Sequence, residues 1–268
     1  MEEQEHIRSF PVSFVPIPTR EYRSHRKQMK ATVQPGAPVI PAPVPTPTPL
    51  PFLPGPRVLV WKQDPSVAEI GIRKAYLPGR VLAGPRDARI DSGAPGIPSV
   101  SPNAFGDFIE APGADAFDAV HTFAVVRQTL TMCQRARAVG GAPAPLPWQW
   151  NGAANADPIS VFPHAGVTQN AYYTRNDKAL KFFYFNASAP TPHTVYTCRS
   201  LDIVAHETGH AILDGLKPGW LLMGNPPQTG GLHESFGDQI AIFLALSQMD
   251  QVEAVIAQTK ANLHDKTF

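Results

Sequence analysis

The sequence predicts an α+β fold, with a β-rich N-terminal part that contains one long helix and a helical C-terminal part. Short apolar runs of strand length, separated by glycine and proline, occupy much of residues 57–200. Beyond residue 200, apolar side chains recur at three- and four-residue spacing, which is typical of helices that bury one face. The proline-rich stretch that precedes these two parts has a composition that does not form a packed core. We therefore divide the chain into residues 1–56, 57–200 and 201–268.

Residues 1–56 are predicted to form a disordered tail that ends in a proline-rich linker. Proline, alanine, valine and threonine dominate residues 35–56, and this composition favours an extended polyproline II spacer. The preceding residues 1–34 contain little that a core would bury. We expect the tail to act as a handle for an export or carrier partner.

Charge and hydropathy argue against two classes of partner. The formal net charge is +1, which indicates neither nucleic acid nor an anionic membrane surface. No apolar run is long enough to span a bilayer. Residues 1–5 are acidic and no hydrophobic segment follows them, so we expect synthesis in the cytoplasm without a signal peptide. Export, if it occurs, would follow a route that does not use one.

Four segments are predicted to be strands because they are short, apolar and rich in β-branched or aromatic residues: 58–61, 80–83, 171–174 and 179–185. The polar residues between the last two predict a hairpin turn. A long helix precedes this hairpin, because apolar residues recur at helical spacing over residues 123–133 and Gly140 ends the pattern. His121 on this helix is interpreted as a packed or surface residue rather than a ligand.

The C-terminal part is predicted to contain three helices. The first begins after Ser200, which can cap it, and stops near Gly215. A Pro/Gly loop over residues 217–231 leads to a second helix that opens at Glu234. On that helix four apolar residues are expected to face the core: Phe236, Ile240, Phe243 and Leu244. A short third helix covers residues 252–262.

The two cysteines, Cys133 and Cys198, are predicted to be buried free thiols. Their positions fit no metal-ligand spacing, and a single pair makes a poor disulfide framework. Cys133 falls within the long helical pattern, and Cys198 comes just before the first C-terminal helix.

The most informative motif is H-E-T-G-H at residues 206–210. Residues four apart project from one face of a helix, so His206 and His210 can reach a single Zn²⁺ at about 2.0–2.1 Å each. Glu207 lies beside that face, near enough to touch a metal-bound water without being a ligand. Gly209 costs about 1 kcal/mol relative to alanine inside a helix, which the close approach of another backbone would explain.

A third protein ligand is needed if one position on the metal is to stay open for water. Glu234 is the candidate, because it falls on a separate predicted helix that can pack against the first. Asp238 lies four residues later on the same face, where it can accept the free ring N–H of a ligating histidine. His233 is a rival ligand, or else lines the cleft. The alternative for Glu234 and Asp238 is an ordinary solvated helix face.

These motifs resemble those of the thermolysin-like zinc metallopeptidases, gluzincins in which H-E-x-x-H is followed by a downstream glutamate. Residues 202–210 are similar to the family's active-site helix, and residues 234–238 to its E-x-x-x-D third-ligand segment. Residues 170–173, Asn-Ala-Tyr-Tyr, resemble the edge strand that binds substrate backbone. Residues 116–119 and the helix after them resemble its first long helix. The resemblance covers roughly residues 115–250 and implies a thermolysin-like zincin catalytic domain.

The resemblance implies a role for each residue near the metal. His206, His210 and Glu234 would bind one zinc ion. Asp238 would orient His206. Glu207 would take a proton from the zinc-bound water and deliver it to the leaving amine.

The resemblance also implies how a substrate would bind. Asn170 and the backbone C=O of Ala171 would hold an extended peptide as an added strand. Ile203, one turn before His206, would help to line an apolar specificity pocket. Tyr172 and Tyr173 would wall the cleft, although packing is an equal alternative for both.

The sequence departs from the family in its oxyanion-stabilising groups. Family members carry a tyrosine between the second histidine and the glutamate, whereas Trp220 is the only aromatic residue between His210 and Glu234. Because the sequence ends at Phe268, its helical C-terminal part is shorter than the family's, and the histidine and arginine of that part have no assigned counterpart. Losing one such donor costs about 2.7–4 kcal/mol of transition-state stabilisation. The family's calcium sites also lack matching acidic clusters, so calcium is not supported.

The sequence therefore predicts a zinc-dependent endopeptidase that acts on peptide or protein substrates. The alternative is a weakly active or inactive zinc-stabilised binding or cargo module, attached to a partner through residues 1–56. The intact Glu207 favours the peptidase, because structural zinc needs no general base. The short C-terminal part favours the module, and a fragment completed by another chain is a third possibility.

Overall fold

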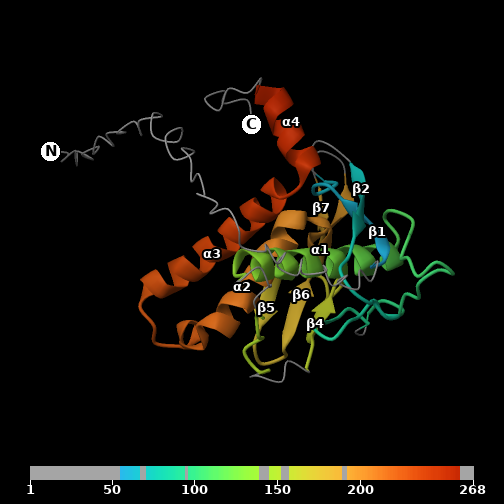
Figure 1. Cartoon of the computed structure of the whole chain (residues 1–268). Helices are drawn as coiled ribbons and strands as arrows, with labels where there is room; N and C mark the ends of the chain where they lie inside the picture. Colours follow the sequence, from blue (N-terminus) through green and yellow to red (C-terminus); the bar gives the residue numbers. More distant parts are fainter. Residues whose placement is uncertain are drawn as a thin grey trace, which may run out of the picture. The chain divides into compact units, whose positions relative to one another are not determined.

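The computed structural model describes residues 55–66, 71–93, 96–138, 145–151, 157–188 and 192–259. All of them belong to one unit, which spans Pro51–Phe268. The predicted tail lies outside the described residues except for Gly55 and Pro56, as does the end of the last predicted helix beyond residue 259. Within the described ranges the fold is mixed α+β, as predicted, with four α-helices and several small sheets (Figure 1).

The N-terminal strands form a small antiparallel pair. β1 (Arg57–Trp61) confirms the first predicted strand and pairs with β2 (Ile72–Tyr76), which the sequence analysis missed. The strand predicted at residues 80–83 is wrong. Instead Leu82 and Arg86 exchange backbone hydrogen bonds of 2.8 and 3.1 Å, so the chain folds back on itself within a tight turn.

A four-stranded sheet carries the predicted hairpin at one edge. Its order is β3 (Ile90–Asp91), β4 (Ile159–Phe162), β6 (Ala179–Phe182) and β5 (Ala171–Thr174). The first three strands are parallel, whereas β5 runs antiparallel to β6 and forms the edge. The predicted hairpin is confirmed, and the backbone of β5 is therefore open on one side.

The strand predicted over residues 179–185 is in fact two strands in different sheets. β6 ends at Phe182, and β7 (Tyr184–Ala187) pairs with β8 (His193–Tyr196). Phe183 between them donates its N–H both to the Thr197 hydroxyl at 2.9 Å and, more weakly, to the C=O of Asn170 at 3.3 Å. The apolar pattern continues across this change of partner, so the pattern alone predicted one strand.

Helices α1 (Asp115–Ala136) and α2 (Leu201–Leu216) confirm the two predicted helices and pack against each other. α2 also packs on α3 (Pro227–Leu246) and on β5, so it links the helices to the sheet edge (Figure 1). Ser200 occupies the N-cap position of α2, but its side chain makes no cap bond and instead donates to the carboxylate of Asp202. α4 (Met249–Thr259) follows α3 after a bend of 85°.

The start of α3 was predicted wrongly. The helix begins at Pro227, so Glu234 lies near its middle and much of the predicted loop is helical. Proline is tolerated in a first turn because the first helical N–H groups have no intrahelical partner. Ile240 and Leu244 are buried as predicted, but Phe243 is 55% exposed. The predicted buried face of the helix therefore wrongly included Phe243.

Glycine allows α2 and α3 to cross closely. A Cβ placed on Gly209 would lie 3.1 Å from the Cα of Gly237 and 3.4 Å from the Cβ of Ile240. The prediction that Gly209 is present because another backbone approaches it is thus confirmed. The close crossing brings the H-E-T-G-H segment of α2 against the middle of α3.

The other local predictions also have clear outcomes. Cys133 and Cys198 are buried and free, as predicted. His121 is fully buried and accepts the Trp61 N–H at 3.2 Å, so it is a packed residue. Within the described part of the chain no single helix is long and apolar enough to cross a membrane, and only α3 with residues 249–257, across the bend, meets the length and composition criteria as a pair.

Candidate metal centre

Three predicted ligands meet where α2 crosses α3. The Nε2 atoms of His206 and His210 lie 3.0 Å apart. Glu234 Oε2 lies 3.3 Å from His206 Nε2 and 3.6 Å from His210 Nε2. The two imidazoles come from successive turns of α2, and the carboxylate comes from the facing turn of α3. Glu234 and Asp238 are 67% and 71% exposed, as on a solvated helix face, and both also approach His206.

The spacing of these atoms fits a small divalent ion. Ligands placed tetrahedrally at 2.0–2.1 Å from zinc lie about 3.3–3.4 Å from one another, and the observed separations are 3.0–3.6 Å. Burial lowers the pKa of His210 to about 4 against the opposing charge of Glu234, so that ring is neutral at pH 7 and can bind metal. The Glu234 side chain is 67% exposed. The centre is therefore open to solvent on the α3 side.

Asp238 occupies the predicted position behind His206. Its Oδ1 lies 2.9 Å from His206 Nδ1, the ring nitrogen that faces away from the other ligands. Gly237 leaves room for this ring, because a Cβ there would lie only 2.8 Å from Nδ1 and 2.9 Å from Cε1. Asp238 and Gly237 thus fix the orientation of His206 from the same turn of α3.

His233 lies behind the other ligand. Its Nδ1 is 2.7 Å from His210 Nδ1, and its side chain is buried on α3 one residue before Glu234. It is not among the three residues whose ligand atoms converge. The prediction of His233 as a rival ligand is therefore not supported, and it lines the adjoining cavity instead.

Glu207 lies beside the three candidate ligands and is not one of them. Burial raises the pKa of its carboxyl to about 7, although His206 and the Tyr173 N–H both act to lower it. The Tyr173 backbone N–H donates to Oε2 at 2.9 Å. This bond ties the carboxylate to the open edge of β5 and orients it toward the cleft between α2 and the sheet.

Two cavities meet at His206 and Glu207. The first, about 560 Å³, is lined by α2 and α3 and is mainly apolar: Asp202, Ile203, His206, Glu207, Asp238, Ala241, Ile242 and Ala245. The second, about 350 Å³, lies between α2, β5, α3 and the short helix η2 (Pro218–Leu221), and Trp220 contributes to its wall. All three converging side chains line the second cavity, and His206 also lines the first.

Most of the residues predicted to bind substrate line these cavities, but Asn170 lines neither. Ile203 lines the first, and Ala171 and Tyr172 line the second. Residues two apart on a strand direct their N–H and C=O groups to the same side. Because the Tyr173 N–H reaches Glu207 on the free edge, the C=O of Ala171 also faces that edge. The side chain of Asn170 accepts the Ala171 N–H at 2.9 Å, which places it at the start of the same strand.

A buried cluster that was not predicted from the sequence fixes β5 against α2. Asp214, fully buried on α2, accepts the Tyr173 hydroxyl at 2.8 Å and the Arg175 Nε at 2.9 Å. Arg175 also donates to the backbone C=O of Pro218 at 2.6 Å. The sequence signal that could have revealed this cluster was Asp214, four residues after His210 on the same predicted helix, together with Arg175 in the predicted hairpin turn. The cluster holds the sheet edge beside Glu207.

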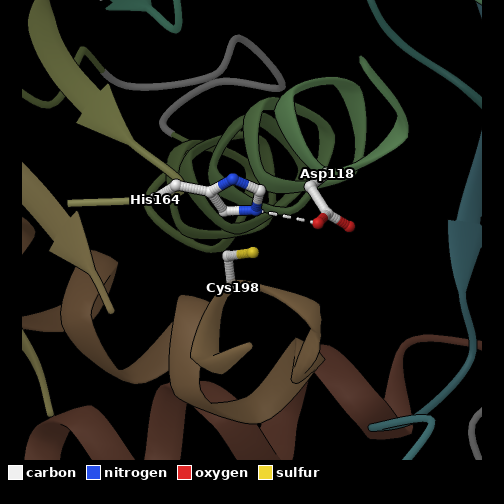
Figure 2. Close-up of side chains that lie close together, drawn as sticks. All are labelled: Asp118, His164 and Cys198. Atoms are coloured by element: carbon white, nitrogen blue, oxygen red, sulfur yellow. Dashed lines mark hydrogen bonds and ion pairs between the residues drawn. The ribbon is translucent and has the colours of Figure 1, made fainter. Parts of the chain in front are cut away.

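A second group of ligand-type side chains lies elsewhere. Atoms of Asp118, His164 and Cys198 come within 4.8 Å of one another, and Figure 2 shows a hydrogen bond only between His164 and Asp118, at 2.9 Å. Arg199 donates to both carboxylate oxygens of Asp118, with Nε–Oδ1 and terminal nitrogen–Oδ2 distances of 2.8 Å. The carboxylate charge is thus already balanced.

The thiol in this second group also argues against a nucleophile in the metal-free protein. Cys198 is fully buried, and burial raises the pKa of its thiol well above the ordinary value. The thiolate is the form that binds metal or attacks a carbonyl. We therefore interpret Asp118, His164 and Arg199 as a buried ion network that joins α1 to the segments before β5 and α2.

Comparison with known proteins adds no family to these observations. No protein-family model matches the chain, and no curated protein matches it. The interpretation of the centre therefore depends on its own geometry and chemistry.

Proposed function

We propose that this protein is a zinc-dependent endopeptidase with a thermolysin-like catalytic domain. The observation that carries the proposal is the meeting of His206, His210 and Glu234 beside a carboxyl group that is not itself a ligand. A structural zinc site is usually closed by four protein ligands. Here three candidate ligands border a cavity, which would leave room for water or substrate beside a bound zinc ion.

The ligand set matches the chemistry that zinc prefers. Two neutral imidazole nitrogens and one carboxylate oxygen are typical of catalytic zinc sites. When bound, zinc supplies Lewis-acid polarisation of a carbonyl group and lowers the pKa of a coordinated water. The residues behind the ligands, Asp238 and His233, hold the two imidazoles in place.

Glu207 would act as the proton carrier. Its carboxylate receives a proton from the attacking water and later donates it to the leaving amine. The Tyr173 N–H, at 2.9 Å from Oε2, keeps the carboxylate beside the cleft during both transfers. A merely structural metal site would have no use for a buried carboxyl group at this position.

The edge of β5 supports a peptide substrate. An extended chain can add to an open strand edge through backbone hydrogen bonds, and the Ala171 C=O faces that edge. Ile203, Ala241 and Ile242 line the larger cavity and would accept an apolar side chain. Trp220 lies at the other cavity, where the resemblance would place a tyrosine. An internal peptide bond would thus lie over the metal with apolar contacts on both sides.

Digestion of unfolded casein tests the proposal. Zinc-loaded protein should cleave casein, and a chelator should abolish cleavage until zinc is restored. The Glu207→Gln variant keeps the metal ligands and removes the proton acceptor, so we expect it to bind zinc normally and to lose activity by at least a hundredfold.

Two results would contradict the proposal in different ways. Casein cleavage that persists in Glu207→Gln would refute the assigned proton transfers. Stoichiometric zinc without cleavage by the wild-type protein would instead favour a zinc-stabilised binding module. A scan of peptide libraries with the active protein would then define the side chain that the larger cavity prefers.

A further inference from the structure

The two histidine ligands have different partners on their outward nitrogens. His206 Nδ1 faces the carboxylate of Asp238 at 2.9 Å. His210 Nδ1 faces another imidazole nitrogen, His233 Nδ1, at 2.7 Å. A carboxylate accepts a hydrogen bond whichever proton positions the rings adopt. An imidazole accepts one only on its unprotonated nitrogen.

Metal binding decides where the protons lie. The Nε2 atoms of His206 and His210 face each other and Glu234, so these nitrogens must present lone pairs to a metal. Each neutral ring then carries its single proton on Nδ1. His210 Nδ1–H must donate to the one atom in front of it, which is His233 Nδ1. His233 in turn can only accept there if its own proton lies on Nε2.

We propose that His233 is a positioning residue that holds His210 in its metal-binding tautomer by accepting the His210 Nδ1–H on its own Nδ1. The inference rests on the proposed zinc site and specifies how one of its ligands is oriented. Glu234 and His233 are adjacent on α3, so one turn of this helix supplies both a ligand and the acceptor for another ligand.

Among the described residues, the contact with His210 is the one hydrogen bond that can determine the tautomer of His233. The side chain is 3% exposed, and within the described part of the chain its Nε2 has no hydrogen-bond partner. Nothing opposite Nε2 therefore prescribes a proton there or forbids one. Several charged or titratable groups act on the ring: Asp214, Glu234, Arg175 and His206. None of these is its hydrogen-bond partner, whereas His210 Nδ1 is within 2.7 Å.

Two substitutions separate an acceptor role from a packing role. His233→Asn keeps an acceptor close to the position of Nδ1, because the amide oxygen of asparagine and the Nδ1 of histidine lie at similar distances from the backbone. His233→Leu fills similar space without an acceptor. His164→Asn serves as the matched control, because this histidine belongs to the separate Asp118 network.

Zinc affinity is measured by competition with a chromophoric chelator. We expect His233→Leu to bind zinc 10–100-fold more weakly than wild type, as is usual when the partner of a ligating histidine is lost. His233→Asn should stay within a few-fold of wild type, and His164→Asn should be unchanged. Equal affinity of the leucine variant and wild type would overturn the inference. So would equal losses in both His233 variants, since that pattern indicates packing.

A second measurement needs no variant. Two-bond ¹H–¹⁵N spectra of the zinc-loaded wild-type protein report which ring nitrogen carries each proton. We expect the His210 proton on Nδ1 and the His233 proton on Nε2. A His233 proton on Nδ1 in protein that binds zinc and cleaves casein would overturn this inference and leave the proposed function intact. Failure of the wild-type protein to bind zinc would overturn both.

Discussion

Gly237→Ala is expected to disable the metal centre while leaving the fold in place. Gly237 faces His206 across the α2–α3 contact. An added Cβ would lie 2.8–3.0 Å from the ring atoms Nδ1, Cε1 and Cγ. Contacts this short require a shift, so the ring must move. The ring belongs to one of the three side chains that are proposed to bind the metal, so its movement disturbs that site.

The size of the effect follows from these distances. An ordinary contact begins near 3.4 Å, so the ring must shift by roughly 0.5 Å, more than the tolerance of about 0.2 Å on metal–ligand distances. We expect zinc affinity to fall by at least 10–100-fold, the loss typical of disturbing a ligand's support. For the metal-free protein, a gain of about 1 kcal/mol from replacing a helical glycine opposes an overpacking cost of about 1–3 kcal/mol. Its stability should change by no more than about 2 kcal/mol.

The assay combines chelator competition with urea unfolding of the metal-free protein. Gly231→Ala is the matched control, because it lies on the same helix and its added Cβ would have nothing within 4 Å. This control should gain up to about 1 kcal/mol of stability and keep wild-type zinc affinity. Wild-type zinc affinity in Gly237→Ala would refute the reasoning, since the His206 ring would then not occupy the position on which the metal centre depends.

Three further predictions concern the ion networks. Asp118→Asn leaves the partly buried Arg199 without its carboxylate partner and should lower the free energy of unfolding in urea titrations by about 3 kcal/mol, the lower end of the range for a broken buried pair. A loss below 1 kcal/mol would contradict the network. Burial acts to raise the pKa of Asp118, but hydrogen bonds from His164 and Arg199 outweigh it and hold the pKa below the ordinary value of 3.8. Because the folded-state pKa of Asp118 is lowered, its contribution to the free energy of unfolding is fully present above pH 3.8 and is lost as the pH falls through the folded-state pKa. The acid-induced loss of stability should therefore be shallower in Asp118→Asn than in wild type. An unchanged pH profile would argue against the ion pair between Asp118 and Arg199. Tyr173→Phe removes the 2.8 Å bond to Asp214 and should cost about 1.5–3 kcal/mol in thermal or urea unfolding, whereas an unchanged stability would show that Arg175 alone satisfies that carboxylate.

The convergence of His206, His210 and Glu234 was predictable because the residues around it obey helical spacing. The four-residue separation of His206 and His210, and of Glu234 and Asp238, places each pair on one face. Gly209 was informative for a different reason. Its cost in a helix needed an explanation, and the close approach of Gly237 supplies it. Patterns that depend on local geometry within one helix therefore carried over to three dimensions.

The missed features depend on contacts between distant parts of the chain. The break between β6 and β7 arises because Phe183 bonds to Thr197, fourteen residues away. The first turns of α3 contain Pro227, Gly230 and Gly231, which are typical of a loop; they are mostly exposed and extend the part of the helix that packs on α2 from His233 onward. The role of His233 could not be read from sequence, because it depends on which ring nitrogen faces His210.

X-ray absorption at the zinc edge of the loaded protein tests the central claim most directly. The account predicts one zinc per chain, bound by two imidazole nitrogens and by oxygen at about 2.0–2.1 Å, with no sulfur in the coordination shell. A zinc–sulfur distance near 2.3 Å would place the ion at Cys198 with Asp118 and His164. That result would contradict the assignment of the metal to His206, His210 and Glu234.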